Sequence, residues 1–263
     1  MASPTYTVRA LVLRKTRLSE SDLIVTFLSE TGAQLRAVAK GARKPTSQFA
    51  SRLELFSEVD VLSAEGRNLD VVKEARLVRG HDGLRTSLEH ATAAAPMVEL
   101  LERITQQDLE EPRLFQASSV AFSSLEDAPA SMAPALAAAH LLKTLAFAGL
   151  RPSLNACAVC GTPLDAAQSA PNVSVRFSFS EGGAVCADCA HTCETLPVRA
   201  STIAWANAFL SSSFADIAQR SVPLDVSFAV LRLVQGLVRE HVGARLKSLE
   251  FLFSCGLFGD DVE

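Results

Sequence analysis

The sequence has one Trp and one Tyr among 263 residues, and its first 80 residues hold few aromatic side chains that could stack on a ligand: Tyr6, Phe27, Phe49 and Phe56. It also lacks the short motifs of common catalytic and nucleotide-binding sites, because H-E-x-x-H, G-x-S-x-G, G-x-x-x-x-G-K-[ST] and G-x-G-x-x-G do not occur. A zinc deaminase needs H-x-E and P-C-x-x-C, which are absent as well. These absences argue against an enzyme.

No apolar run reaches the roughly 20 residues of a membrane span, and the first nine residues are polar and mixed, unlike a targeting segment. Five of the six cysteines cluster between residues 157 and 193 rather than spreading through the chain as a disulfide framework. We therefore expect a cytoplasmic protein without a membrane partner.

Four of the cysteines form two C-x-x-C pairs, Cys157 with Cys160 and Cys186 with Cys189, separated by 25 residues. Each pair can place two thiolates on one metal from a tight turn, so the two pairs together complete a tetrahedron. Glycines next to both pairs allow the positive φ that such turns use. We predict one structural Zn²⁺ per chain, and four thiolates leave no open position for a catalytic water.

Two alternatives concern these cysteines. A thioredoxin-like redox pair would need a C-x-x-C that opens a helix in a βαβ unit, whereas both pairs here stand in a Gly/Pro/Ser-rich stretch. His191 or Cys193 lies close enough to Cys189 to replace a ligand. Cys255 follows apolar residues and is expected to be a buried core cysteine.

The first 80 residues have the alternation of short strands, expected at residues 6–14, 22–28, 34–40, 53–62 and 68–78. Phe27 and Phe56 are expected in their core. Five strands in so short a segment predict an OB-type barrel, because closure removes exposed sheet edges.

A helical period begins near Leu84. Helices are expected to open at Pro96 and Pro112, to cover residues 135–148, and to resume at Ser201 and after Pro223, with Asp225 as a cap. Between them, residues 173–179 alternate like a strand. The predicted fold is α+β: an OB-fold at 1–80, a helical domain at 81–150 and 198–263, and an inserted zinc-ribbon-like module at 151–197.

Charge is distributed unevenly. The chain has a net charge of -4, yet residues 1–52 hold nine Lys or Arg against three Asp or Glu. Such asymmetry suggests that the N-terminal module meets a polyanion, and with few aromatic residues the contacts should be to phosphates. The predicted DNA-binding residues are Arg14, Lys15, Arg17, Arg36, Lys40, Arg43, Lys44 and Arg52.

Six segments in order resemble landmarks of the RecO family of bacterial recombination mediators: ESDLIVTFLSETG, AVAKGARKPTSQFASRLELFSEVDV, MVELLERITQQDLEEPRLFQ, LLKTLAFAGLRPSLNACAVCG, FSFSEGGAVCADC and RLKSLEFL. The resemblance spans essentially the whole chain. It implies a non-enzymatic, nucleoid-associated protein that binds single- and double-stranded DNA and anneals complementary strands. It also implies partnership with RecR in loading RecA, and contact with the acidic, apolar C-terminal tail of the single-strand-binding protein through the helical domain.

A second interpretation from the residues alone is a protein-interaction adaptor in which the barrel and the zinc module dock polypeptides. The basic residues would then form an ordinary solvated surface. A zinc hydrolase or deaminase is a third interpretation, and the absent motifs make it remote.

Overall fold

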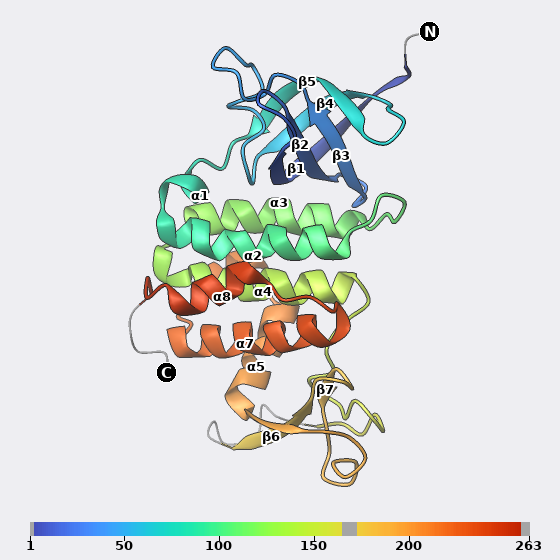
Figure 1. Ribbon diagram of the computed structural model, residues 1–263. Coiled ribbons are helices and arrows are strands. Elements are labelled where there is room, and N and C mark those ends of the chain that lie inside the picture. The colour runs from blue at the N-terminus through green and yellow to red at the C-terminus, as the bar shows by residue number, and fades with distance from the viewer. Residues whose placement is uncertain (1–2, 165–172, 259–263) are drawn as a thin grey trace. The chain divides into compact units, whose positions relative to one another are not determined.

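The computed structural model describes residues 3–164 and 173–258, which fold into two compact units (Figure 1). The first unit contains the residues up to Ala94 together with Val98–Glu126. The second contains Ala95–Met97 and the chain from Asp127 onward. Each unit has its own buried apolar residues.

The first unit begins with a closed barrel of five strands: β1 (Thr5–Arg17), β2 (Leu23–Ser29), β3 (Gln34–Ala39), β4 (Glu58–Ala64) and β5 (Asp70–Arg79). Around the barrel the order is β1-β2-β3-β5-β4, and the β3–β5 pair is parallel whereas the others are antiparallel. The predicted OB-fold is therefore confirmed.

The barrel core consists of small and β-branched side chains from alternate strand positions, with Phe27 as its largest member at 2% exposure. The expectation for Phe27 is confirmed, but the one for Phe56 needs correction. Phe56 is buried outside this cluster, with its ring centroid 5.8 Å from that of Phe122. It packs against Phe122 rather than joining the barrel core.

Two strand boundaries differ from the sequence prediction in ways that matter for the site. Because β1 continues to Arg17, beyond the end predicted at residue 14, Lys15 and Arg17 lie on the strand together with Arg14. The strand expected from residue 53 begins only at Glu58, since the backbone amide of Leu53 donates to the carbonyl of Phe49 in a helical turn. Residues 40–57 thus form one long β3–β4 loop.

Three helices complete the first unit: α1 (Gly83–Thr86), α2 (Leu88–Ile104) and α3 (Pro112–Asp127). The start predicted at Pro112 is confirmed, while the one at Pro96 is wrong because Pro96 lies inside α2. The Ser87 side chain accepts a bond from the backbone amide of His90 and so caps α2 two turns earlier.

The second unit is built around α4 (Ala133–Phe147), preceded by a short 3-10 helix, η1 (Ala130–Met132). Helix α4 contacts α5 (Ala200–Ser211), α6 (Phe214–Ala218) and α7 (Leu224–His241), and α7 contacts α8 (Lys247–Ser254). Pro223, not Asp225, is the N-cap of α7, so the predicted cap is wrong by two residues. Helices α6 and α8 were not predicted.

One window, Ala130–Phe147, is long and apolar enough to cross a membrane by length and composition alone, which the sequence analysis did not expect. Yet 72% of this window is buried inside the protein. Its apolar residues pack against the neighbouring helices, as those of a core helix do.

Between α4 and α5 the chain forms a small module with a three-stranded sheet of β6 (Ser174–Ser178), β7 (Gly183–Ala184) and β8 (Leu196–Arg199), in the order β7-β6-β8. The strand predicted at residues 173–179 is confirmed. Phe179 fixes the module on α7: a Cβ at Gly236 would lie 2.2 Å from its ring, and His241 Nε2 donates to its carbonyl at 2.7 Å.

Candidate nucleic-acid interface and metal centre

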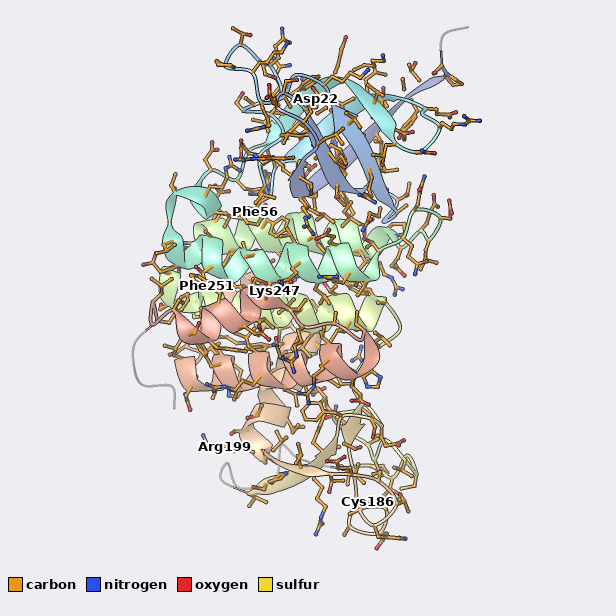
Figure 2. All side chains as sticks on the ribbon, in the orientation of Figure 1. Asp22, Phe56, Cys186, Arg199, Lys247 and Phe251 are labelled. Atoms are coloured by element: carbon orange, nitrogen blue, oxygen red, sulfur yellow. The ribbon has the colours of Figure 1, made fainter. Side chains whose placement is uncertain are left out.

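The inserted module brings the four predicted metal ligands together, and Figure 2 labels Cys186 in this part of the chain. The sulfur atoms of Cys157, Cys160, Cys186 and Cys189 all lie within 4.8 Å of one another. The Sγ atoms of Cys160 and Cys186 are 3.8 Å apart. A tetrahedral zinc with Zn–S bonds of about 2.3 Å has sulfur–sulfur edges of about 3.8 Å, so the four side chains fit the ion.

Backbone and hydroxyl donors favour the thiolate form of the first pair. The amides of Cys186 and Cys160 donate to Cys157, the former over 3.4 Å, and lower the pKa of that thiol to about 6. The Thr162 hydroxyl, 3.2 Å from Cys160 Sγ, lowers the pKa of that thiol as well. By contrast, the sulfurs of Cys186 and Cys160 raise the pKa of Cys189. A bound cation would relieve this crowding of sulfurs.

Neither His191 nor Cys193 belongs to the cluster within residues 3–164 and 173–258. The described ligand set is therefore four cysteines, although the sequence left a replacement open. Cys255 is partly exposed, with its Sγ donating to the carbonyl of Leu252 at 3.4 Å, so the expectation of a buried core cysteine is wrong.

The eight predicted DNA-binding residues lie on the barrel and its loop, and they fall into two groups. Four have exposed side chains that form no hydrogen bond or ion pair with the described residues: Arg17, Arg36, Lys40 and Lys44. Arg36 and Lys40 project from the same side of β3 and the residue after it, as strand alternation predicts.

The other four cations are engaged within the protein. Arg14 pairs with Glu102 of α2 at 3.0 Å, and Lys15 with Glu54 at 2.6 Å. The Arg43 guanidinium donates to the carbonyls of Ser19 and Glu20, and Arg52 donates to the carbonyl of Ala75. These side chains position the loop and the strands more than they offer free charge.

A cleft of about 510 Å³ separates the end of β1 from the β3–β4 loop, and we call it the first groove. Its walls include Lys15, Arg17, Arg43 and Lys44, with Glu54 as the only acidic residue among those that line it. Because Lys15 is paired with Glu54, three cations there lack an acidic partner in the groove. This surface is suited to a phosphate chain.

Asp22 is a functional residue that the sequence reading missed. Its carboxylate accepts a bond from the Gly41 amide at 2.8 Å, and this amide, with the Ser21 hydroxyl, lowers the pKa of Asp22. Gly41 has a φ of 67°, which favours glycine. Asp22 thereby fixes the start of the β3–β4 loop beside the barrel strands (Figure 2). An Asp that precedes a strand gives no sequence signal for a partner 19 residues away.

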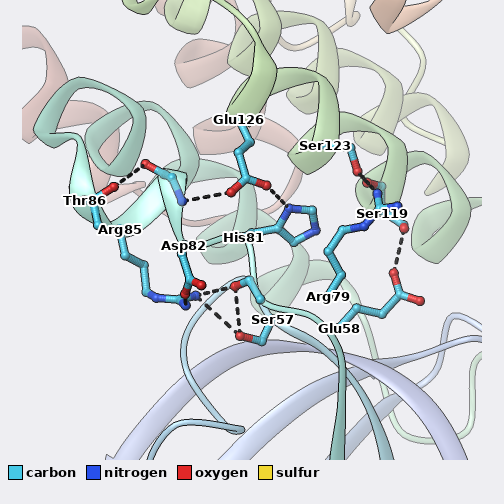
Figure 3. A network of polar contacts seen from close by, with 12 residues as sticks. Ser57, Glu58, Arg79, His81, Asp82, Arg85, Thr86, Ser119, Ser123 and Glu126 are labelled. Carbon is cyan, nitrogen blue, oxygen red and sulfur yellow. Dashed lines mark hydrogen bonds and ion pairs between the residues drawn. The ribbon is translucent and has the colours of Figure 1, made fainter.

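Arg85 fixes the other end of the β3–β4 loop and was also missed. Its guanidinium donates to the carbonyls of Leu55 at 2.8 Å and Gly80 at 2.6 Å, and the Ser57 hydroxyl donates to the same Gly80 carbonyl (Figure 3). The backbone at Phe56 has a φ of 70°, outside the range most residues adopt. The loop is therefore pinned at both ends.

Comparisons with known proteins agree with this arrangement. A family model described as "Recombination protein O N terminal" matches residues 1–81, and one described as "Recombination protein O C terminal" matches residues 85–250. The chain belongs to the RecO family. Among its relatives are the "DNA repair protein RecO" of Nocardioides sp., 38% identical over 70% of this chain and 74% of the relative, and that of Cutibacterium acnes, 33% identical over 95% and 99%. The chain is thus a member of a family of DNA repair proteins.

In this RecO-family chain a buried histidine joins the barrel to α3 (Figure 3). The side chain of His81 is 0% exposed, and its Nδ1 lies 2.8 Å from Glu126, which also accepts a bond from the Gly83 amide. Its Nε2 has no hydrogen-bond partner among the described residues, and its φ is 51°. Burial lowers the pKa of His81, and this outweighs the Glu126 carboxylate, which raises it.

This histidine should make stability depend on pH. Its folded pKa is below the unfolded value of about 6.5, so the unfolded chain binds more protons. The contribution of neutral His81 to the free energy of unfolding is then fully present above about pH 6.5. It is lost as the pH falls below this value and through the folded pKa. His81→Asn keeps a donor for Glu126 and tolerates a positive φ, so urea unfolding at pH 7.5 and 5.5 should show a smaller pH effect than in the unchanged protein.

A second buried histidine, His140, also has a pKa that complete burial lowers, to about 3. Because His140 is present in both the unchanged protein and His81→Asn, the difference between these two proteins reports on His81. The charges around His81 are those of Glu126, Arg79 and Glu58. An identical pH dependence for the two proteins would contradict the assignment to His81.

Proposed function

We propose that this chain is a non-enzymatic recombination mediator that binds single- and double-stranded DNA and anneals complementary strands. With RecR it would help to load RecA onto DNA coated by the single-strand-binding protein, in the cytoplasm and at the nucleoid. The observation that carries the proposal is the set of four exposed cations on the barrel that form no hydrogen bond or ion pair with the described residues, beside a cationic groove.

The aromatic residues of the barrel favour binding to the backbone of DNA over binding to its bases. Phe27 and Phe56 are buried. Tyr6 donates its hydroxyl to Asp70, and burial together with this bond raises the pKa of Tyr6. Phe49 is packed partly against the barrel core. Stacking can thus supply little affinity, and exposed bases would remain free to pair with a second strand.

A salt titration tests this mode of binding. If the four free cations each neutralise one phosphate of a single strand, the slope of log K against log salt is about -2.8, or about -0.7 per contact. Affinity for an oligonucleotide should then fall about 50-fold between about 50 and 200 mM salt. Annealing should be measured in parallel, with and without single-strand-binding protein. Affinity that is independent of salt would contradict the proposal.

We assign a structural Zn²⁺, one per chain, to the cysteine quartet. The four thiolates would hold it with no position left for water, and the ion would supply folding energy to the module. No step in strand annealing is attributed to it.

The contact with the single-strand-binding protein is proposed for the second unit. An apolar cleft of about 360 Å³ lies between β8 and α7, with Phe179, Leu196 and Leu233 in its walls. Arg199 and Arg232 also line it, together with Asp225. Apolar walls with two cations suit a tail that is both acidic and apolar.

A further inference from the structure

A second cleft, of about 640 Å³, lies on the other side of the β3–β4 loop. We call it the second groove. It is lined by Phe49 and Arg52 of the loop and by Asp60, Lys73, Glu74 and Arg76 of β4 and β5. None of its cations except Arg52 was predicted to bind DNA.

The charges of the second groove leave a positive excess. Arg9 of β1 pairs with Asp60 at 2.9 Å, which neutralises one of the two acidic residues. The exposed side chains of Lys73 and Arg76 form no hydrogen bond or ion pair with the described part of the chain. Glu74 is therefore opposed by more than one cation.

Strand register explains why these groups share one surface. Arg9 pairs with Asp60 across β1 and β4, and Asp60 pairs with Arg76 across β4 and β5. The three residues form a row over neighbouring strands of the barrel. Arg76 lies at the end of this row.

The β3–β4 loop separates the two grooves and is held in place. Phe49 lines both grooves, so it is a wall that they share. Leu53, 1% exposed, inserts into the barrel core, and Arg52 is bonded to the carbonyl of Ala75 on β5. Asp22 and Arg85 hold the two ends of the loop. The β3–β4 loop that separates the two grooves is therefore a fixed part of the barrel surface.

We propose that the second groove receives the phosphate backbone of a second DNA strand while the first groove holds the first strand. This inference rests on the proposed function. The β3–β4 loop then keeps two polyanions side by side, and the cations on both sides lower the repulsion between them as they begin to pair. The second groove has acidic residues among its cations and binds the more weakly, so the second strand is free to move into register.

The experiment compares two double variants, Lys73→Ala/Arg76→Ala for the second groove and Arg17→Ala/Lys44→Ala for the first. The second-groove variant should bind a short single strand, at one strand per protein, within about twofold of the unchanged protein. Its annealing rate should fall about tenfold, and the salt dependence of that rate should become shallower by about 1.4 in slope for two lost contacts. A matched control with the same charge change is Arg67→Ala/Arg220→Ala, which should anneal normally because both residues are exposed and outside both grooves.

Two results would overturn the second groove as a separate site. One is an unchanged annealing rate in Lys73→Ala/Arg76→Ala. The other is a loss of single-strand affinity as large as the loss of annealing rate, which would mean one continuous site. Failure of the proposed function has a different signature, because Arg17→Ala/Lys44→Ala would then bind a single strand as well as the unchanged protein.

Discussion

Affinity for single-stranded DNA is expected to fall about a hundredfold when Arg17, Arg36, Lys40 and Lys44 are all replaced by Ala, because four phosphate contacts are lost. The slope of log K against log salt should shrink toward zero in the same variant. These side chains form no hydrogen bond or ion pair with the described residues, so thermal unfolding should stay close to that of the unchanged protein. Fluorescence anisotropy with a labelled oligonucleotide at several salt concentrations measures both quantities.

A matched control separates a local site from a general effect of charge. Arg67, Arg151, Arg220 and Arg239 are also exposed, and replacing them by Ala changes the net charge by the same amount. This control should keep most of the affinity, since none of the four lies on β1, β3 or the β3–β4 loop. Equal losses in the two quadruple variants would contradict a barrel site and favour attraction by net charge alone.

Replacement of Arg43 alone should disturb the β3–β4 loop, whereas replacement of a free cation such as Lys44 should remove only a positive charge. Its guanidinium holds the start of the β3–β4 loop through the carbonyls of Ser19 and Glu20. The sequence analysis predicted the same DNA-binding role for Arg43 and Lys44, because two adjacent basic residues cannot be told apart by their charge. Only the fold separates the residue that shapes the loop from the one that is free to bind.

Local patterns explain why much of the fold could be predicted. Alternation in β3 reports which side chains face the barrel core, and Pro112 opens α3 because a first-turn proline sacrifices no helical bond. The helix start predicted at Pro96 was wrong because the Ser87 cap starts α2 earlier. In the sequence, a proline inside a helix cannot be told from one at its start. A cap depends on backbone geometry that composition does not report.

In the candidate sites, too, residues with local patterns could be predicted and residues with distant partners could not. The cysteine ligands were predictable because each pair is local and the chemistry of thiolates limits the choice. The roles of Asp22 and Arg85 were not, because their partners are 19 and 30 residues away in sequence. The engagement of Arg14 with Glu102, 88 residues later, could likewise not be read from composition.

Replacing Cys157 by Ser is expected to lower zinc affinity by more than about a hundredfold, because loss of even an outer hydrogen-bond partner of a ligand costs about 10- to 100-fold. The unchanged, reduced protein should retain one zinc per chain, measured by atomic emission after dialysis against a mild chelator. Cys186→Ser should behave alike, since its Sγ completes an edge of the same tetrahedron with Cys160. Cys193→Ser and Cys255→Ser are the controls, because neither residue belongs to the described cluster.

The place where stability is lost distinguishes a structural ion from one that serves binding. Without the ion, four crowded sulfurs remain around Cys189, and the module should open locally before the helices do. Hydrogen exchange should therefore accelerate at β6 and at Phe179, which links the module to Gly236 of α7. Exchange in the barrel and affinity for single-stranded DNA should stay unchanged, since the free cations belong to the first unit. Loss of DNA affinity in Cys157→Ser, with barrel exchange unchanged, would contradict a purely structural role and make the module part of the DNA-binding surface.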